Sequence, residues 1–161
     1  MSDPFIQLEQ LYHDTAPALL GYFRRQLAVP ADADDLVQET FVRAIRGFDQ
    51  LQQAATPRAY LFGIAHHVRL DALRRRRHHE PLTNEPIAPP TGEEDARLEP
   101  MRAAISRLPE SQRETLLLKL QQELSYAEIA HVLGIPVGTV RSRLHLALLH
   151  LRHVLNPSPS P

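Results

Sequence analysis

Residues 125–153, SYAEIAHVLGIPVGTVRSRLHLALLHLRH, indicate two helices hinged at a glycine. Ser125 and Glu128 match the S-x-x-E capping box that starts a helix, and the apolar residues on either side of the box are placed as its hydrophobic staple. The remaining positions of a helix-turn-helix follow at Ala130, Gly134 and Val140. A small residue lets the helices approach, glycine permits the turn, and the aliphatic residue anchors the second helix. The combination favours a helix-turn-helix over an ordinary helical hairpin.

The second helix of this motif changes character along its length. At about 100° per residue, one narrow arc collects a stripe that is expected to be buried. The stripe consists of Val140, Leu144, Ala147, Leu151 and Leu155. The opposite side begins polar and basic, as entry into a DNA groove requires, but then carries Leu146 and Leu149. Leu148 is expected at the edge of the stripe. The two outward leucines fit contacts to thymine methyl groups, an apolar docking patch, or ordinary surface leucines.

The composition of the 161-residue chain bounds its class. The chain contains no cysteine, which excludes disulfides and thiolate metal sites and fits a reducing compartment. Its start lacks the features of a signal peptide, and no apolar stretch approaches the ~20 residues of a membrane span. Neither carboxylates nor thiols complete a metal set around its histidines, and no nucleophile–base pair stands out. We therefore expect a soluble, cytoplasmic protein without membrane contact, metal or cofactor that is not an enzyme.

Apolar periodicity predicts three helices in the first half of the chain, and no strand pattern occurs anywhere. The first spans residues 5–27, with a kink or a restart at Pro17. The second begins at three aspartates that suit a helix N-terminus, Asp32, Asp34 and Asp35. Its apolar stripe comprises Val37, Phe41, Ala44, Ile45 and Phe48. A polar loop over residues 49–56 leads to a third helix that starts at Pro57 and ends in four arginines.

Residues 81–98 break every periodicity with four prolines, a glycine and acidic side chains, and so predict a flexible linker. The chain then divides into helical bundles over residues 1–80 and 99–156 and a disordered tail over 157–161. From residue 101 onward, seven Lys or Arg face four Glu, a basic balance that permits nucleic-acid binding. The predicted fold class is all-α, with two small bundles joined by a flexible linker and a helix-turn-helix in the second.

Three stretches in order resemble extracytoplasmic-function sigma factors, the group-four sigma factors of bacterial RNA polymerase. The stretch LPESQRETLLLKLQQELSYAEIAHVLGIPVGTVRSRLHLAL resembles their promoter-binding C-terminal domain. DADDLVQETFVRAIRGF resembles their core-polymerase-binding helix, and PRAYLFGIAHHVRLDALRRRR resembles their helix for the −10 element. The resemblance covers about residues 5–155. It implies a transcription initiation factor that binds core RNA polymerase, directs it to specific promoters and helps to melt the DNA.

The resemblance implies a polymerase-binding site on the second helix. The family's D-L-x-Q-E-x-F pattern is matched by Asp35, Leu36, Gln38, Glu39 and Phe41. Acids at the helix start and amides along one side suit docking on a basic surface through rim charges. Helix capping is the alternative explanation of the three aspartates. The spacing of Phe41 also fits a core residue.

The resemblance implies −10 element contacts along the third helix. They fall on Arg58, Tyr60, His66 and His67 and on the run Arg74, Arg75, Arg76 and Arg77. Tyr60, His66 and His67 depart from the family pattern, although a tyrosine ring can stack on an unpaired base. In the family, the preceding loop captures an extruded base, which points here to residues 48–57. The arginine run suits a phosphate clamp; alternatively it caps the helix, with Asp71 paired to Arg75.

The resemblance implies −35 element contacts by the helix-turn-helix, residues 126–145. The contacting residues would be Thr139, Arg141, Ser142, Arg143 and His145. The implied partners are core RNA polymerase, double-stranded and melted promoter DNA, and an anti-sigma factor that sequesters the protein until a signal arrives. The alternative is a helix-turn-helix regulator or a degenerate sigma-like protein that does not initiate transcription. The paired helices in the first half favour the sigma factor, because a simple repressor has no use for them.

Overall fold

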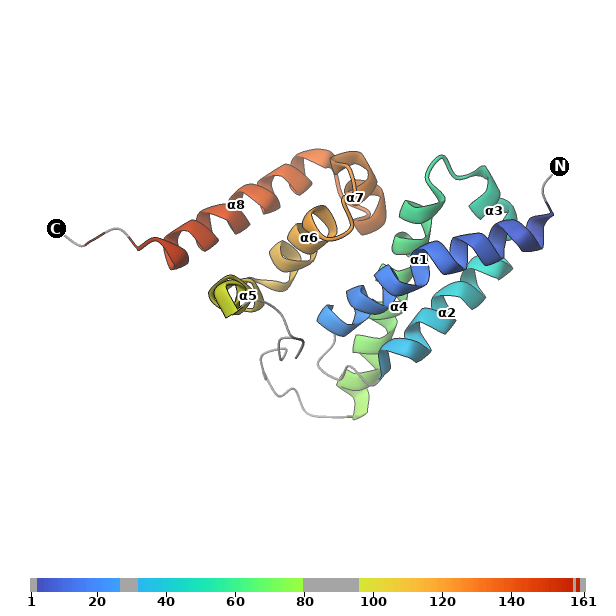
Figure 1. Cartoon of the computed structure of the whole chain (residues 1–161), viewed down its shortest axis with the longest axis horizontal. Coiled ribbons are helices and arrows are strands. Elements are labelled where there is room, and N and C mark those ends of the chain that lie inside the picture. Colours follow the sequence, from blue (N-terminus) through green and yellow to red (C-terminus); the bar gives the residue numbers. More distant parts are fainter. Residues whose placement is uncertain (1–2, 27–31, 80–95, 158, 160–161) are drawn as a thin grey trace. The chain divides into compact units, whose positions relative to one another are not determined.

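The computed structural model describes residues 3–26, 32–79, 96–157 and 159. The chain forms two compact units, Met1–Glu85 and Pro86–Pro161 (Figure 1). Every regular element in the described ranges is helical, so the all-α fold expected from the sequence is confirmed. Leu27, most of the predicted linker (81–95) and three of the five predicted tail residues (158, 160 and 161) lie outside the described residues.

The first unit consists of four helices around one core. They are α1 (Pro4–Gln26), α2 (Ala33–Arg46), α3 (Phe48–Gln53) and α4 (Pro57–His79). Helix α4 packs against the other three, and Figure 1 shows it crossing α1. Its fully buried apolar side chains are Leu61, Phe62, Ala65 and Val68, and Leu19 and Phe23 of α1 are buried with them. One face of α4 is therefore fixed by packing.

Three details of the first unit differ from the sequence-based expectation. Helix α1 does not restart at Pro17, because the buried turns around that residue hold the helix together despite one missing donor. The predicted polar loop contains the short helix α3, because Leu51 is buried there and anchors a turn. Ile45 was expected in the stripe of α2 but is 53% exposed. Helix α2 ends at Arg46, and the helices packed against it cover a narrower arc of its surface than the apolar stripe predicted.

The second unit places a helix-turn-helix on two supporting helices. It contains the 3-10 turn η2 (Ala96–Leu98), α5 (Glu99–Ser106), α6 (Glu110–Leu120), α7 (Tyr126–Leu133) and α8 (Val137–Leu155). The turn η2 occupies the last three residues of the predicted linker. Helix α8 packs against α5, α6 and α7. Val140, Leu144, Ala147 and Leu151 are buried as the stripe predicted, whereas Leu155 at the end of the helix is only half-buried.

Within the described ranges, no single helix has both the length and the hydropathy to cross a membrane. Helices α7 and α8 meet these criteria only as a pair, and the pair is bent by 103° at its junction.

Candidate nucleic-acid and polymerase interface

Helix α2 carries its predicted polymerase-binding residues on two different sides. Asp35 and Gln38 are exposed and Glu39 is half-buried. Leu36 and Phe41 are both buried in the core of the first unit, where Phe41 packs against the ring of Tyr12 at 4.8 Å between centroids. Direct contact of these two residues with polymerase stays a prediction, whereas the core explanation of Phe41 is confirmed. The polar members of the motif remain available on the surface.

The aspartates at the start of α2 differ in their roles. Asp34 and Asp35 lie in the first turn, where the helix dipole stabilises their negative charges. Asp32 stands at the N-cap but makes no side-chain capping hydrogen bond. Its carboxylate instead lies 3.8 Å from the guanidinium of Arg76 on α4. Simple capping therefore accounts for only part of the cluster.

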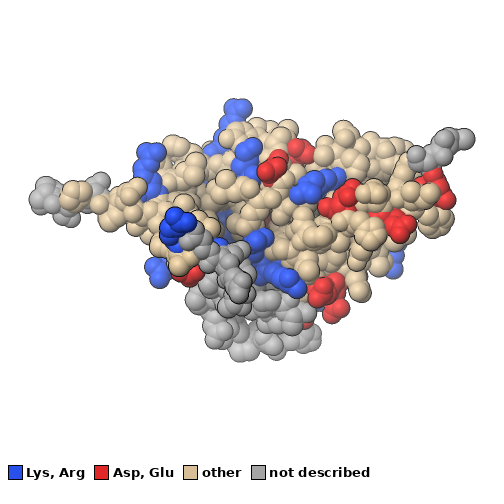
Figure 2. Space-filling view, in the orientation of Figure 1, with Lys and Arg blue, Asp and Glu red and all other residues tan. Residues whose placement is uncertain are grey.

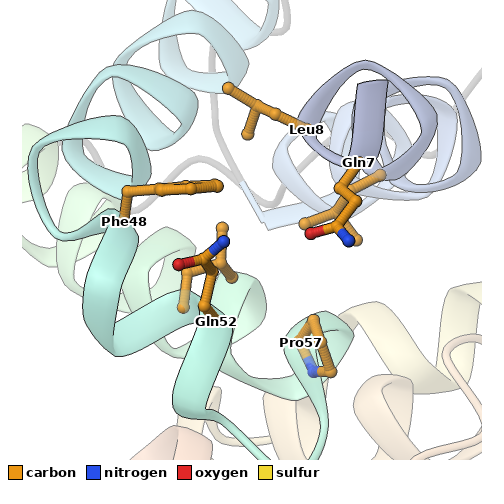
Figure 3. Close-up of a pocket in the computed structure, with 7 residues that line it drawn as sticks. Gln7, Leu8, Phe48, Gln52 and Pro57 are labelled. Carbon is orange, nitrogen blue, oxygen red and sulfur yellow. The ribbon is translucent and has the colours of Figure 1, made fainter. Parts of the chain in front are cut away.

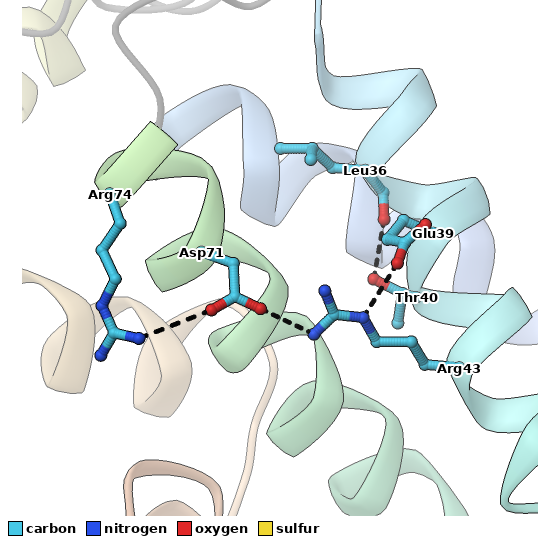
Figure 4. A network of polar contacts seen from close by, with 6 residues as sticks. All are labelled: Leu36, Glu39, Thr40, Arg43, Asp71 and Arg74. Carbon is cyan, nitrogen blue, oxygen red and sulfur yellow. Dashed lines mark hydrogen bonds and ion pairs between the residues drawn. The ribbon is translucent and has the colours of Figure 1, made fainter. Parts of the chain in front are cut away.

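Ion pairs connect α2 to the basic end of α4 (Figure 4). The Arg43 guanidinium donates to Glu39 on its own helix at 3.0 Å and lies 3.0 Å from the Asp71 carboxylate of α4. Asp71 also faces Arg74 at 3.7 Å. The hydrogen bond to Glu39, followed by the contacts to Asp71, raises the pKa of Arg43 above its usual value. The predicted pair of Asp71 with Arg75 was wrong for the described chain, because the carboxylate turns toward α2.

The first half of α4 holds its predicted −10 residues in different environments. The guanidinium of Arg58 lies 5.4 Å from the ring centroid of Phe62, and the Tyr60 hydroxyl donates to Gln50 of α3 at 3.0 Å. His66 is buried, whereas His67 is exposed. The buried imidazole is poorly placed to touch a base in the free chain. Arg58, Tyr60 and His67 retain accessible surface.

The four arginines at the end of α4 form a cationic surface. Arg74, Arg75 and Arg77 are exposed and Arg76 is half-buried. Arg74 lies 3.7 Å from Asp71 and Arg76 lies 3.8 Å from Asp32. Both pairs are long and exposed to solvent, so they neutralise the arginine charges only weakly. Figure 2 shows acidic and basic side chains interspersed over the drawn face of the first unit as a whole.

A cavity of about 410 Å³ opens beside the segment that was expected to hold an extruded base. It is lined by Gln7, Leu8 and Leu11 of α1, Phe48, Leu51 and Gln52 of α3, and Pro57 of α4. Figure 3 shows the ring of Phe48 and the amides of Gln7 and Gln52 around this space. Apolar walls with a few polar groups are typical of ligand pockets. The contribution of α1 could not be found from the motif, because α1 is distant in sequence.

The helix-turn-helix has the geometry that its sequence predicts. Ser125 Oγ accepts a hydrogen bond from the Glu128 amide at 3.1 Å, and Glu128 Oε1 accepts one from the Ser125 amide at 3.0 Å. Gly134 adopts a left-handed conformation, φ 65° and ψ 37°, at the end of α7. Ala130 and Val140 are buried where the helices meet. The bend of 103° between α7 and α8 lies in the range of DNA-binding helix pairs.

The predicted −35 residues cluster on the first turns of α8. Arg141, Ser142 and His145 are exposed, and Thr139 and Arg143 are half-buried. The Ser142 hydroxyl donates to the Gly138 carbonyl at 3.0 Å, so in the free chain it is engaged by its own helix. These residues form a polar exposed surface at the start of α8, and His150, Arg152 and His153 form a second one near its end.

The middle of the exposed side of α8 is apolar. Leu146 and Leu149 point to solvent as expected, at 50% and 47% exposure. Leu148 was expected at the edge of the buried stripe, but it is 56% exposed. That expectation was wrong, because α5, α6 and α7 cover only a narrow arc of α8. The exposed leucines number three rather than two.

Tyr126 and Lys119 lie beside the predicted −35 residue Arg141, and the sequence motifs did not indicate them. The Tyr126 ring lies at the start of α7, with Lys119 Nζ of α6 at 5.0 Å and the Arg141 guanidinium of α8 at 5.9 Å from its centroid. One sequence signal was available, since Tyr126 is the only Phe, Tyr or Trp after residue 62. It is nevertheless 39% exposed rather than placed in the core. In the part of the chain that the structure describes, no cluster of three potential metal ligands occurs.

Comparisons with known proteins agree with this arrangement. The family model of sigma-70 region 2 matches residues 11–79, and that of sigma-70 region 4 matches residues 98–151. The ECF RNA polymerase sigma factor EcfG of Rhodopseudomonas palustris is 36% identical over 142 residues, which cover 84% of this chain and 78% of EcfG.

Two solved structures share the fold over nearly the whole chain. The sigma factor RpoE of Bartonella quintana, solved with the anti-sigma factor NepR, has a TM-score of 0.79 and 24% identity, with 95% of this chain and 99% of RpoE covered. CnrH, solved with the cytosolic domain of CnrY, has a TM-score of 0.69 and 28% identity, with 94% and 89% covered. The chain therefore belongs to the extracytoplasmic-function sigma factors, the transcription initiation factors that direct RNA polymerase to promoters.

Proposed function

We propose that α2 binds core RNA polymerase through its polar edge, namely Asp35, Gln38 and Glu39. These side chains occupy matching positions of the family motif and have accessible surface. Leu36 and Phe41 act indirectly, because their burial fixes the helix from which the polar groups project. Acidic and amide groups around a small apolar centre suit recognition of a basic partner.

Promoter melting is assigned to α4 and to the cavity next to it. Arg74 to Arg77 bind backbone phosphates, while Arg58, Tyr60 and His67 lie near the unpaired bases. A flipped base would stack on Phe48 and meet the amides of Gln7 and Gln52, which can read the polar edge of a base. Changing each glutamine separately to leucine should alter the preferred base at one −10 position, whereas an unchanged preference would place the base elsewhere.

Recognition of the −35 element is assigned to the first turns of α8. Thr139, Arg141, Ser142, Arg143 and His145 would enter the major groove, as the second helix of this motif commonly does. The observation that carries the proposal is the capped and sharply bent helix pair, with these polar residues at the start of its second helix.

We also propose that an anti-sigma factor regulates the chain. The likeness to CnrH, which was solved in complex with the cytosolic domain of CnrY, supports a regulatory partner of this kind. The chain would act in the cytoplasm, where RNA polymerase works, and by binding rather than by catalysis. If promoter-dependent transcription persists when each candidate neighbouring regulator is present in excess, the regulatory part of the proposal fails.

The test of the proposed function is run-off transcription with purified core polymerase and a library of upstream regions. We expect transcripts from a small set of templates that share two sequence elements. Polymerase binding without any transcript would instead indicate a sigma-like protein that does not initiate. Substitution of Asp35, Gln38 and Glu39 by alanine should abolish polymerase binding, while circular dichroism should show that the chain still folds.

A further inference from the structure

Two cations of the second unit converge on one aromatic ring. The Nζ atom of Lys119 lies 5.0 Å from the centroid of Tyr126, and the Arg141 guanidinium lies 5.9 Å from it. Both distances are within the reach of cation–π attraction. The three residues come from α6, α7 and α8, so the ring stands where all three helices of the second unit's DNA-reading end approach one another.

The ring is held in place by its own backbone. Tyr126 is the first residue of α7 and directly follows Ser125, whose capping box is made at both hydrogen bonds. Lys119 is also restrained, because its ammonium group donates to the Leu124 carbonyl at 3.4 Å. The fold therefore restrains the ring and Lys119, and Arg141 approaches them from the first turns of α8.

The arrangement keeps both positive charges available. Two cations that approach one ring repel each other, and proteins commonly offset such repulsion with a nearby carboxylate. In the described residues, however, neither Lys119 nor Arg141 makes an ion pair with a carboxylate. The face of an aromatic ring attracts cations without cancelling their charge. A pair of uncancelled, oriented cations at an exposed edge is suited to an anion.

We propose that Tyr126 is a positioning residue that holds Lys119 and Arg141 as a two-cation site for the DNA backbone at the edge of the helix-turn-helix. The proposal rests on the proposed function of α8 in reading promoter DNA. It adds two residues to the proposed DNA-binding surface of α8: Lys119 of α6 binds phosphate, and Tyr126 of α7 orients the two cations. The phosphate contact fixes the register of α8 in the groove, because contacts to the backbone position a protein on the duplex.

The test compares substitutions of Tyr126 in the holoenzyme, with a duplex that the wild-type holoenzyme enriches from a randomised library. Tyr126→Phe and Tyr126→Trp should bind like the wild type or more tightly, because both keep a cation-binding ring face. Tyr126→Leu should weaken binding about three- to tenfold and should lower the slope of log affinity against log salt concentration by up to about one. Thermal melting by circular dichroism identifies any variant that fails to fold.

A double-mutant cycle separates positioning from direct contact. In the Lys119→Met, Arg141→Met background, Tyr126→Leu should have almost no further effect on binding. In the background of Arg152→Met, a control arginine far along α8, Tyr126→Leu should keep its full effect. An equal loss in both backgrounds, or a loss in Tyr126→Phe as large as in Tyr126→Leu, would overturn the proposal. If the library yields no enriched duplex at all, the proposed function fails instead.

Discussion

Arg74 and Arg141 are both exposed cations on helices that we propose to face DNA, but their surroundings differ. Arg74 faces the Asp71 carboxylate, which also binds Arg43 and so connects two helices. Arg141 lies near a tyrosine ring. A carboxylate orients an arginine and subtracts one charge from the surface, whereas a ring orients it and subtracts none. In the first unit, acidic groups connect neighbouring helices through ion pairs. In the second unit, the local structure around Arg141 comes from a tyrosine ring, a capping box and a glycine turn.

The largest expected effect comes from removing the cations of the first unit. Changing Arg74, Arg75, Arg76 and Arg77 together to glutamine should lower promoter affinity by about two orders of magnitude and reduce the salt slope by about two to four, because each lost phosphate contact removes about 0.9. Filter binding of the holoenzyme over a salt series measures both quantities. A slope that falls by less than one would show that these arginines serve the helix end rather than the DNA.

A second effect concerns how the two units start their helices. Ser125→Ala removes a complete capping box and should lower the free energy of unfolding of the second unit by about 1 kcal/mol. Asp32→Ala removes an N-cap residue that makes no capping hydrogen bond, and it should cost less, since only an exposed pair with Arg76 is lost. Urea unfolding followed by circular dichroism compares the variants. A larger loss for Asp32→Ala would reverse the contrast.

A third effect concerns DNA affinity, which should change in opposite directions when a carboxylate or a ring beside an arginine is removed. Asp71→Asn should raise DNA affinity about two- to threefold at low salt, because a negative charge leaves the cationic end of α4. It should also lower stability slightly, because the bridge from α4 to α2 is lost. Tyr126→Leu should change DNA affinity in the opposite direction. A tenfold loss of affinity in Asp71→Asn would mean that orientation of Arg43 and Arg74 outweighs charge.

The smallest expected effect concerns the leucines of α8. Changing Leu146 and Leu149 to arginine should leave the salt slope of DNA binding unchanged if contact ends at the first turns of the helix. Arg141→Met serves as the matched control and should lower the slope by about one. Stronger binding with a steeper slope in the leucine variant would show that the DNA-facing surface extends along α8. It would also show that Leu146 and Leu149 do not serve only to bind another protein.

The sequence predicted most of what depends on neighbours along the chain. The capping box at Ser125, the turn at Gly134 and the start of α4 at Pro57 are fixed within four residues, so their motifs were sufficient. Residues that matched the family pattern were less informative about exposure. Leu36 and Phe41 fit the polymerase-binding motif, yet the packing of α2 against α4 and α1 buries them.

The sequence by itself determined the all-α class, the helix-turn-helix and the family, because helical period, caps and turn residues act locally and recur as motifs. Only the tertiary structure decided which side chains remain at the surface. It exposed Leu148, turned Asp71 toward Arg43, and brought Lys119 and Arg141 to the ring of Tyr126. The reason is that burial and ion pairing depend on the arc that neighbouring helices cover, and that arc is set by elements distant in the chain.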